Sequence, residues 1–198
     1  MRVGLYGGCF NPVHEGHVAA ARNAQEAVLL DEVVFIPSGH PPLKGNTGLA
    51  DGKHRVAMLN FAIQSEKAMR VSTIEIDRIG PSFTVDTVRS LQATFPKGTE
   101  LFFLLGDDCV DRLQHWKGIA DLHSMLRFAI LPRNKIYAAT PDERLIWLEF
   151  ASVATSSSSV RAILSSGGRP SEGMMHASVL DYITRHKLYA GPVVHACL

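Results

Sequence analysis

The residues with the clearest chemical use lie near the start of the chain, in the segment GGCFNPVHEGH at residues 7–17. His14 and His17 are three residues apart, so their rings fall on the same side of a helix that begins there. Imidazole donors beside the free amides of a helix N-terminus can hold phosphate oxygens, and Gly7 and Gly8 would let a phosphate approach the backbone. The segment therefore favours a phosphate site, although the histidine pair also fits a helix surface or half of a metal site.

A second candidate for phosphate binding is the segment SSSSVR at residues 156–161. It would supply a helix N-terminus, serine hydroxyls and the guanidinium of Arg161 to the outer phosphates of a triphosphate. The alternative is an ordinary serine cap followed by a surface arginine. Lys44, in the loop SGHPPLKGNTG, could close over the same phosphates or remain solvated.

The elements that must position these residues alternate between short apolar runs and helical patterns. We predict strands at residues 2–6, 32–36, 71–76, 101–105 and 128–131, and helices at residues 19–30, 54–65, 84–95, 141–150, 158–166 and 177–186.

This order of elements predicts a single-domain α/β protein. All-apolar strands such as LFFLL, separated by helices, are typical of a doubly wound, Rossmann-like parallel sheet with helices on both faces. No linker divides residues 1–198, so we expect one domain, with a C-terminal helical part at about 156–190. Ligands bind at the carboxyl ends of such strands, which directs attention to the loops after Tyr6, Ile36 and Leu105.

Composition excludes several classes of protein. The net charge of +1 gives no global basic field, so we expect no nucleic acid partner. No apolar run approaches the roughly 20 residues of a membrane span, so we expect no membrane partner and a soluble protein. The three cysteines are widely separated, which fits the reducing cytosol and predicts a cytoplasmic location. The sequence excludes neither a monomer nor a homo-oligomer.

The first motif, GGxFxPxHxGH, resembles the HxGH nucleotidyltransferases, and the chain as a whole resembles bacterial nicotinate-nucleotide adenylyltransferases. The resemblance runs nearly end to end and rests on several motifs in the right order. PPLK at 41–44 is similar to that family's PPHK loop, and GPSFTVDTV at 80–88 to its GPSYTxxT segment. LLGDDCVDRLQHW at 104–116 is similar to its GxD strand end followed by Trp, SSSSVR to its SSTxIR helix start, and KLY at 187–189 to its usual ending.

The resemblance implies transfer of the adenylyl group of ATP to nicotinate mononucleotide, which gives nicotinate adenine dinucleotide and pyrophosphate in NAD biosynthesis. The expected partners are ATP with Mg²⁺ and a pyridine mononucleotide. A phosphate monoester has a second pKa of about 6, so the nucleophile is already mostly dianionic and needs no catalytic base. Positioning and charge stabilisation are then the main work of the protein.

The resemblance also assigns residues to this reaction. His14, His17 and Arg161 would be catalytic, with His17 nearest the α-phosphoryl group. The segment at about 156–190 would complete the ATP site, and no protein residue is expected to ligate a metal. Asp108 would be the motif aspartate that binds a ribose, and Asp107 a helix cap. The residues expected to bind ATP are Gly7, Gly8, Phe10, Lys44, Gly106, Asp108, Ser157 and Ser158.

Trp116 and Thr84 are the residues that the resemblance assigns to the mononucleotide. An indole can stack on a pyridinium ring, which contributes about 0.5 to 2 kcal/mol. The alternative role of Trp116 is core packing. Thr84 would join backbone amides at a helix start in holding the nicotinate carboxylate, and its alternative role is an N-cap.

The chain departs from the family pattern at a few positions. Leu43 stands where the family usually has histidine, and Phe83 where it has tyrosine. Cys9 and Asn11 replace Thr and Asp, and Ser158 replaces Thr. Leu43 removes a polar contact from the proline loop, so the role of residues 38–50 is the least defined.

Other readings of the sequence remain open. The same chemistry could act on nicotinamide mononucleotide or phosphopantetheine, and the GPSFTVDT and Trp116 segments favour the pyridine nucleotides. A nucleotide-sensing module without catalysis would also carry these motifs. An RNA-binding relative of the tRNA synthetases is disfavoured by the charge.

Overall fold

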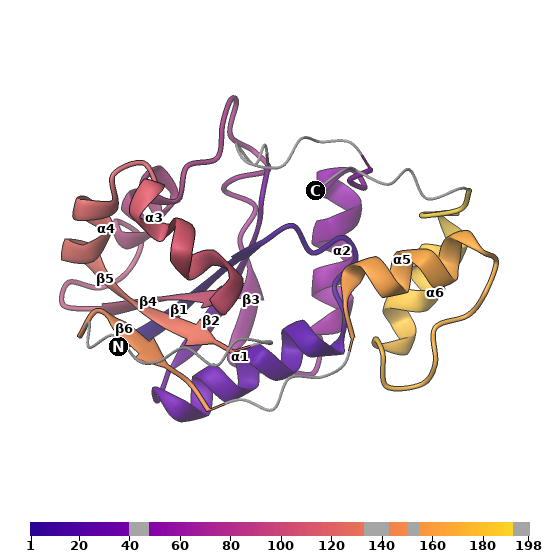
Figure 1. The fold of residues 1–198 in the computed structure, drawn as a ribbon, viewed down its shortest axis with the longest axis horizontal. Helices are drawn as coiled ribbons and strands as arrows, with labels where there is room; N and C mark the ends of the chain where they lie inside the picture. The colour runs from indigo at the N-terminus through magenta and orange to yellow at the C-terminus, as the bar shows by residue number, and fades with distance from the viewer. Residues whose placement is uncertain (40–47, 133–142, 150–154, 192–198) are drawn as a thin grey trace.

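A computed structural model describes residues 1–39, 48–132, 143–149 and 155–191. Its centre is a six-stranded, all-parallel sheet with the strand order β3-β2-β1-β4-β5-β6 (Figure 1). The order reverses on either side of β1, so β1 and β4 flank the crevice in which doubly wound sheets bind ligands. The strands are β1 (Arg2–Gly8), β2 (Glu32–Pro37), β3 (Met69–Val71), β4 (Glu100–Gly106), β5 (Leu126–Leu131) and β6 (Leu145–Trp147).

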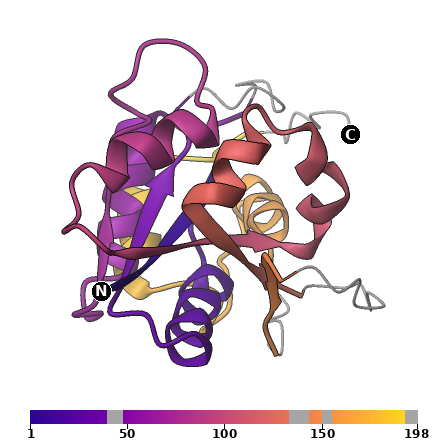
Figure 2. The same cartoon turned by 90° about the vertical axis from the view of Figure 1, so that its left-hand side faces the viewer.

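Helices cover both faces of this sheet. In Figure 2 the sheet lies between α1 on one side and α3 and α4 on the other. Within the described ranges, no helix is long and apolar enough to cross a membrane. The helices are α1 (Glu15–Ala27), α2 (Gly52–Ala62), α3 (Thr84–Gln92), the 3₁₀ helix η1 (Asp107–His115), α4 (Ile119–Met125), α5 (Ser157–Ser165) and α6 (Ala177–Arg185).

The strands alternate their side chains between two hydrophobic cores, one on each face. Along β4, Phe102 and Leu104 pack with residues of α1, α2, α5 and α6. Leu101, Phe103 and Leu105 pack on the opposite face with residues of α3, α4 and η1. The C-terminal helices contribute the buried residues Val160, Val179 and Ile183 to the first core, so they share it with the sheet.

The structure confirms the predicted doubly wound α/β fold and corrects two elements. The predicted strand at 71–76 is wrong: β3 ends at Val71, where its pairing with β2 stops, and the chain then turns. The predicted helix at 141–150 is also wrong, because residues 145–147 form β6 beside β5. Residues 133–142 and 150 lie outside the described ranges. The sequence reading missed η1 and α4, and α1 begins at Glu15 rather than residue 19.

We predict that Ile183→Ala lowers the free energy of unfolding by about 2 to 5 kcal/mol, because the side chain of Ile183 is buried in the core shared with the sheet. Chemical denaturation followed by circular dichroism measures this change. Asp181→Ala, an exposed position on the same helix, is the matched control and should change stability by less than about 0.5 kcal/mol. A loss below 1 kcal/mol for Ile183→Ala would contradict a shared core.

Candidate active site

The two histidines of the first motif lie together where β1 leads into α1. His14 is the N-cap residue of α1, and its backbone N–H donates to Nδ1 of His17 at 3.3 Å. The ring centroids are 3.8 Å apart, as the spacing predicted. His14 is buried and His17 is partly exposed. The pair therefore sits at a helix N-terminus, where backbone amides and imidazole nitrogens can face the same anion.

Gly16, which lies between the two histidines, leaves room for the His14 ring. A Cβ on Gly16 would lie 3.0 Å from two atoms of the His14 ring. At Gly7 a Cβ would lie 2.9 Å from the ring of Phe103, and at Gly8 it would lie 3.0 Å from the ring of Phe10. Aromatic side chains thus occupy the space beside both glycines of the pair, so these glycines serve packing as well as any phosphate approach.

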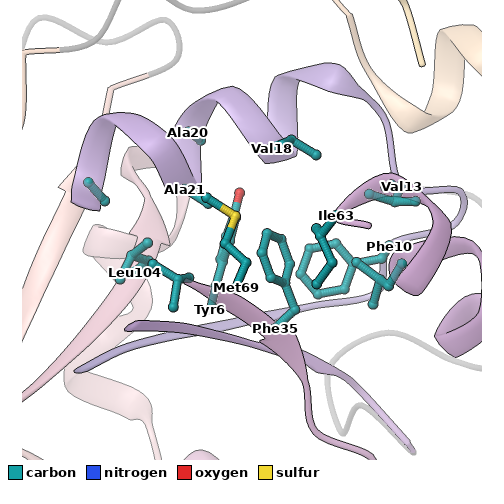
Figure 3. Packing of buried hydrophobic residues seen from close by; sticks show 14 of the residues in the cluster. Tyr6, Phe10, Val13, Val18, Ala20, Ala21, Phe35, Ile63, Met69 and Leu104 are labelled. Carbon is teal, nitrogen blue, oxygen red and sulfur yellow. The ribbon is translucent and has the colours of Figure 1, made fainter. Parts of the chain in front are cut away.

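Phe10 supports the His17 ring from within the core. Its backbone has φ 45°, an uncommon conformation for a residue other than glycine, and its side chain is 2% exposed. The ring lies 5.1 Å from that of His17 and 5.6 Å from that of Phe35, centroid to centroid. Figure 3 shows Phe10 and Phe35 packed together near Ile63. Any contact of Phe10 with ATP would therefore involve its backbone.

The serine and arginine segment docks directly on the loop that carries the histidines. The Ser157 hydroxyl donates to the carbonyl of Pro12 at 2.9 Å. Nη1 of Arg161 donates to the carbonyl of Asn11 at 2.6 Å, and Nη2 donates to Oγ of Ser158 at 3.3 Å. The structure thus places two motifs about 145 residues apart in sequence side by side, with the N-terminus of α5 facing the same loop as that of α1.

Asn11 joins this loop to two further segments. Its Oδ1 accepts hydrogen bonds from the backbone of Ala50 at 3.0 Å and from the Tyr189 hydroxyl at 2.8 Å. Its Nδ2 donates to the carbonyl of Gly48 at 2.9 Å. The amide therefore uses both its donor and its acceptor, which explains how asparagine serves at this position. Tyr189 belongs to the KLY segment, so that C-terminal segment helps to hold the first loop in place.

Arg55 is a part of the site that the sequence reading missed. It is 3% exposed and donates to the carbonyls of Cys9 and Ala50, at 3.0 and 2.9 Å. Burial lowers the pKa of Arg55, and burial raises the pKa of Tyr189, against the opposing effect of Arg161 and Arg55. In the sequence, Arg55 is recognisable only as a basic residue at a buried position of the helical pattern, and no motif includes it.

The guanidinium groups of Arg55 and Arg161 both donate to backbone carbonyls of the first loop. Such contacts orient a cation without neutralising it, so the loop lies in a positive local field that attracts anions. A pocket of about 240 Å³ adjoins Arg55, and it is lined by Gly39, Leu49, Ala50, Asp51, Gly52, Arg55 and Ile76.

The predicted residues at the end of β4 divide between the core and the surface. Gly106 ends the strand, Asp107 is 1% exposed, and Asp108 is exposed in the first turn of η1. Trp116, half-buried at the end of η1, packs edge-on against Phe103 with ring centroids 5.9 Å apart. The half-buried indole of Trp116 therefore contacts the core and still exposes surface that a ligand can contact.

Thr84 is the first residue of α3, and Phe83 rather than Thr84 occupies the N-cap position. The backbone amides of Asp86 and Thr87 turn back to the Phe83 carbonyl. Thr84 is partly exposed at this helix start. Lys44 and Leu43 lie outside the described residues.

A parallel α/β sheet with a histidine pair and two helix N-termini at the carboxyl end of its first strand has the arrangement with which doubly wound proteins bind the phosphates of nucleotides. Residues 5–163 match the family model described as cytidylyltransferase-like. A protein of Shouchella clausii (strain KSM-K16) named as a probable nicotinate-nucleotide adenylyltransferase is 40% identical over 189 residues, which cover 95% of this chain and 96% of that one. One of Clavibacter sepedonicus with the same name is 35% identical over 98% of this chain and 96% of its own length.

The chain belongs to the cytidylyltransferase-like family, and within it to the nicotinate-nucleotide adenylyltransferases. The fold agrees with solved structures of Plasmodium falciparum nicotinic acid mononucleotide adenylyltransferase. The complex with APC has a TM-score of 0.74 at 18% identity and covers 95% of this chain and 96% of that one. The complex with NaAD has a TM-score of 0.73 at 19% identity and covers 95% and 97%.

We predict that Tyr189→Phe lowers the free energy of unfolding by about 0.5 to 1.5 kcal/mol, because it removes the hydrogen bond to Asn11. Denaturant unfolding of Tyr189→Phe, Asn11→Ala and the double variant gives the coupling between the two side chains. If Tyr189→Phe lowered the free energy of unfolding equally in the wild type and in Asn11→Ala, the two side chains would not be coupled. Tyr189 would then not anchor the first loop.

Proposed function

We propose that this chain catalyses the transfer of the adenylyl group of ATP to nicotinate mononucleotide, producing nicotinate adenine dinucleotide and pyrophosphate in NAD biosynthesis. Membership of the nicotinate-nucleotide adenylyltransferases supports the activity. The single structural observation that carries the proposal is the docking of Ser157 and Arg161 onto the carbonyls of the histidine loop. This docking brings together the two segments to which we assign the phosphates of ATP.

The chemistry is direct in-line attack of the mononucleotide phosphate on the α-phosphorus of ATP. The new bond joins a phosphate oxygen of the mononucleotide to that phosphorus, and the bond to the bridging oxygen of pyrophosphate breaks. At neutral pH the nucleophile is already mostly dianionic, since its second pKa is about 6. The protein has to align the two substrates and meet the negative charge that develops on the leaving group.

The geometry suits the roles proposed for the phosphate-binding residues. His17, the more exposed member of the histidine pair, is assigned to the α-phosphoryl group, with His14 behind it. Arg161 and the hydroxyls of Ser157 and Ser158 are assigned to the β- and γ-phosphates. A guanidinium already held by a backbone carbonyl at 2.6 Å loses little freedom when phosphate binds, which supports a preorganised site.

We assign the mononucleotide to the space between the N-terminus of α3 and the end of β4. The free amides at Thr84 suit the nicotinate carboxylate, and the half-buried indole of Trp116 offers a flat surface for the pyridine ring. Asp108, exposed at the start of η1, is assigned to a ribose.

Mg²⁺ would arrive with ATP, and when bound it would neutralise part of the triphosphate charge. Within the described ranges no three His, Cys, Asp or Glu side chains are grouped as a metal cage, and a magnesium ion held by phosphates and water requires few protein ligands.

We predict that His17→Ala reduces kcat about 100- to 1000-fold, because it removes a preorganised donor to the charge that develops in the transition state. Pyrophosphate release with saturating ATP, Mg²⁺ and nicotinate mononucleotide measures the loss. His176→Ala, at the N-cap of α6, is the matched histidine control and should retain turnover. Unchanged turnover in His17→Ala would remove His17 from the mechanism.

Comparison of the two pyridine mononucleotides tests the acceptor. We predict a higher kcat/KM for nicotinate than for nicotinamide mononucleotide, because the N-terminus of α3 stabilises an anionic carboxylate more strongly than a neutral amide. The same pyrophosphate assay measures both substrates. Release of pyrophosphate with neither mononucleotide would reject the proposed function.

A further inference from the structure

A buried carboxylate lies between the two proposed halves of the site, in the segment that joins β3 to α3. Glu75 is 8% exposed, and Thr87 and Ser82 beside it are 1% and 7% exposed. A charged group at this depth is retained only where donors satisfy it. None of the roles assigned above uses Glu75.

Three groups donate hydrogen bonds to this carboxylate, one from α3, one from the loop after β2 and one from its own segment. The Thr87 hydroxyl, on α3, donates to Oε1 of Glu75 at 2.8 Å. The Ser82 hydroxyl and the backbone N–H of Gly39 also donate to it. Nη1 of Arg78 donates to Oγ1 of Thr87 at 2.8 Å, which places a cation next to the network. Burial raises the pKa of Glu75, against the opposing effect of the bonds from Thr87 and Ser82, the Arg78 charge and the Gly39 bond.

The backbone at Gly39 approaches Glu75 so closely that no side chain fits between them. A Cβ on Gly39 would lie 2.0 Å from the carbonyl oxygen of Glu75 and 3.1 Å from Oγ of Ser82. The segment that follows β2 is therefore packed against the segment that precedes α3 by backbone contact as well as by the carboxylate.

The same contacts continue to the histidine loop. The backbone N–H of Ser38 donates to the carbonyl of Gly8 at 2.9 Å, and the Ser38 hydroxyl lies 3.6 Å from Sγ of Cys9. A continuous path thus runs from Thr87 on α3 through Glu75 and Gly39 to the first loop. It connects the helix start assigned to the mononucleotide with the loop assigned to ATP.

We propose that Glu75 is a positioning residue that sets the distance between the mononucleotide and the triphosphate by holding the start of α3 against the loop after β2. The inference rests on the proposed function, because it takes the N-terminus of α3 as the acceptor site. In-line attack requires reacting atoms about 3 to 3.5 Å apart, and a misplacement of about 1 Å can cost about 100-fold in rate. A carboxylate tied both to α3 and to the loop after β2 is suited to preventing that misplacement.

The test compares Glu75→Gln, Thr87→Val and Thr87→Ser in the full chain. Glutamine keeps the size of Glu75 but turns one acceptor oxygen into a donor, and valine removes the Thr87 hydroxyl without changing its shape. Serine restores that hydroxyl. Glu100→Gln, an exposed carboxylate paired with Arg127, is the matched control. Steady-state kinetics of pyrophosphate release give kcat and both KM values, equilibrium dialysis gives the Kd of ATP, and thermal melting reports folding.

We expect Glu75→Gln and Thr87→Val to lower kcat by about 10- to 100-fold and to raise the KM of nicotinate mononucleotide, while the Kd of ATP stays within about twofold. Thr87→Ser should recover most of the activity. The proposal would be overturned if Glu75→Gln and Thr87→Val folded normally and had the same kcat and KM values as Glu100→Gln. It would also be overturned if Thr87→Ser did not restore the activity lost in Thr87→Val. The same holds if the substitutions weakened the binding of ATP as much as that of the mononucleotide. An inactive wild type would instead reject the proposed function and leave the proposal without its basis.

Discussion

The site depends on the docking of the N-terminus of α5 onto the loop between β1 and α1. Two side-chain donors, the hydroxyl of Ser157 and the guanidinium of Arg161, bind the carbonyls of Pro12 and Asn11. These bonds span most of the chain and are made possible by the core that α5 and α6 share with the sheet. The C-terminal helices therefore bring Ser157 and Arg161 onto the loop that follows the first strand.

Charge and burial act together around this contact. Arg55 and Arg161 are held by carbonyls of the first loop, while Asn11 contributes a neutral amide at its centre. A polyanion that binds beside the loop meets cations already in position, so little conformational entropy is lost in ordering them. Phe10 packs against both the His17 ring and Phe35, so the hydrophobic core supports one histidine of the pair directly.

The sequence predicted the parts of the site that local patterns encode. His14 and His17 follow helical spacing, and the SSSS run is a recognisable helix start. Arg55, Glu75 and Tyr189 were not assigned roles, because their partners Cys9, Gly39 and Asn11 are distant in sequence and only the folded chain brings them together. The same limit explains β6, whose LIW segment becomes a strand only by pairing with β5.

We propose that the histidine pair and the tip of α5 bind the same triphosphate. A crystal structure of the protein with Mg²⁺ and a non-hydrolysable ATP analogue would show whether they do. We expect one molecule of nucleotide to place phosphate oxygens within hydrogen-bonding distance of both His17 and Arg161. Phosphates bound away from this loop, or in contact with only one of the two residues, would contradict it.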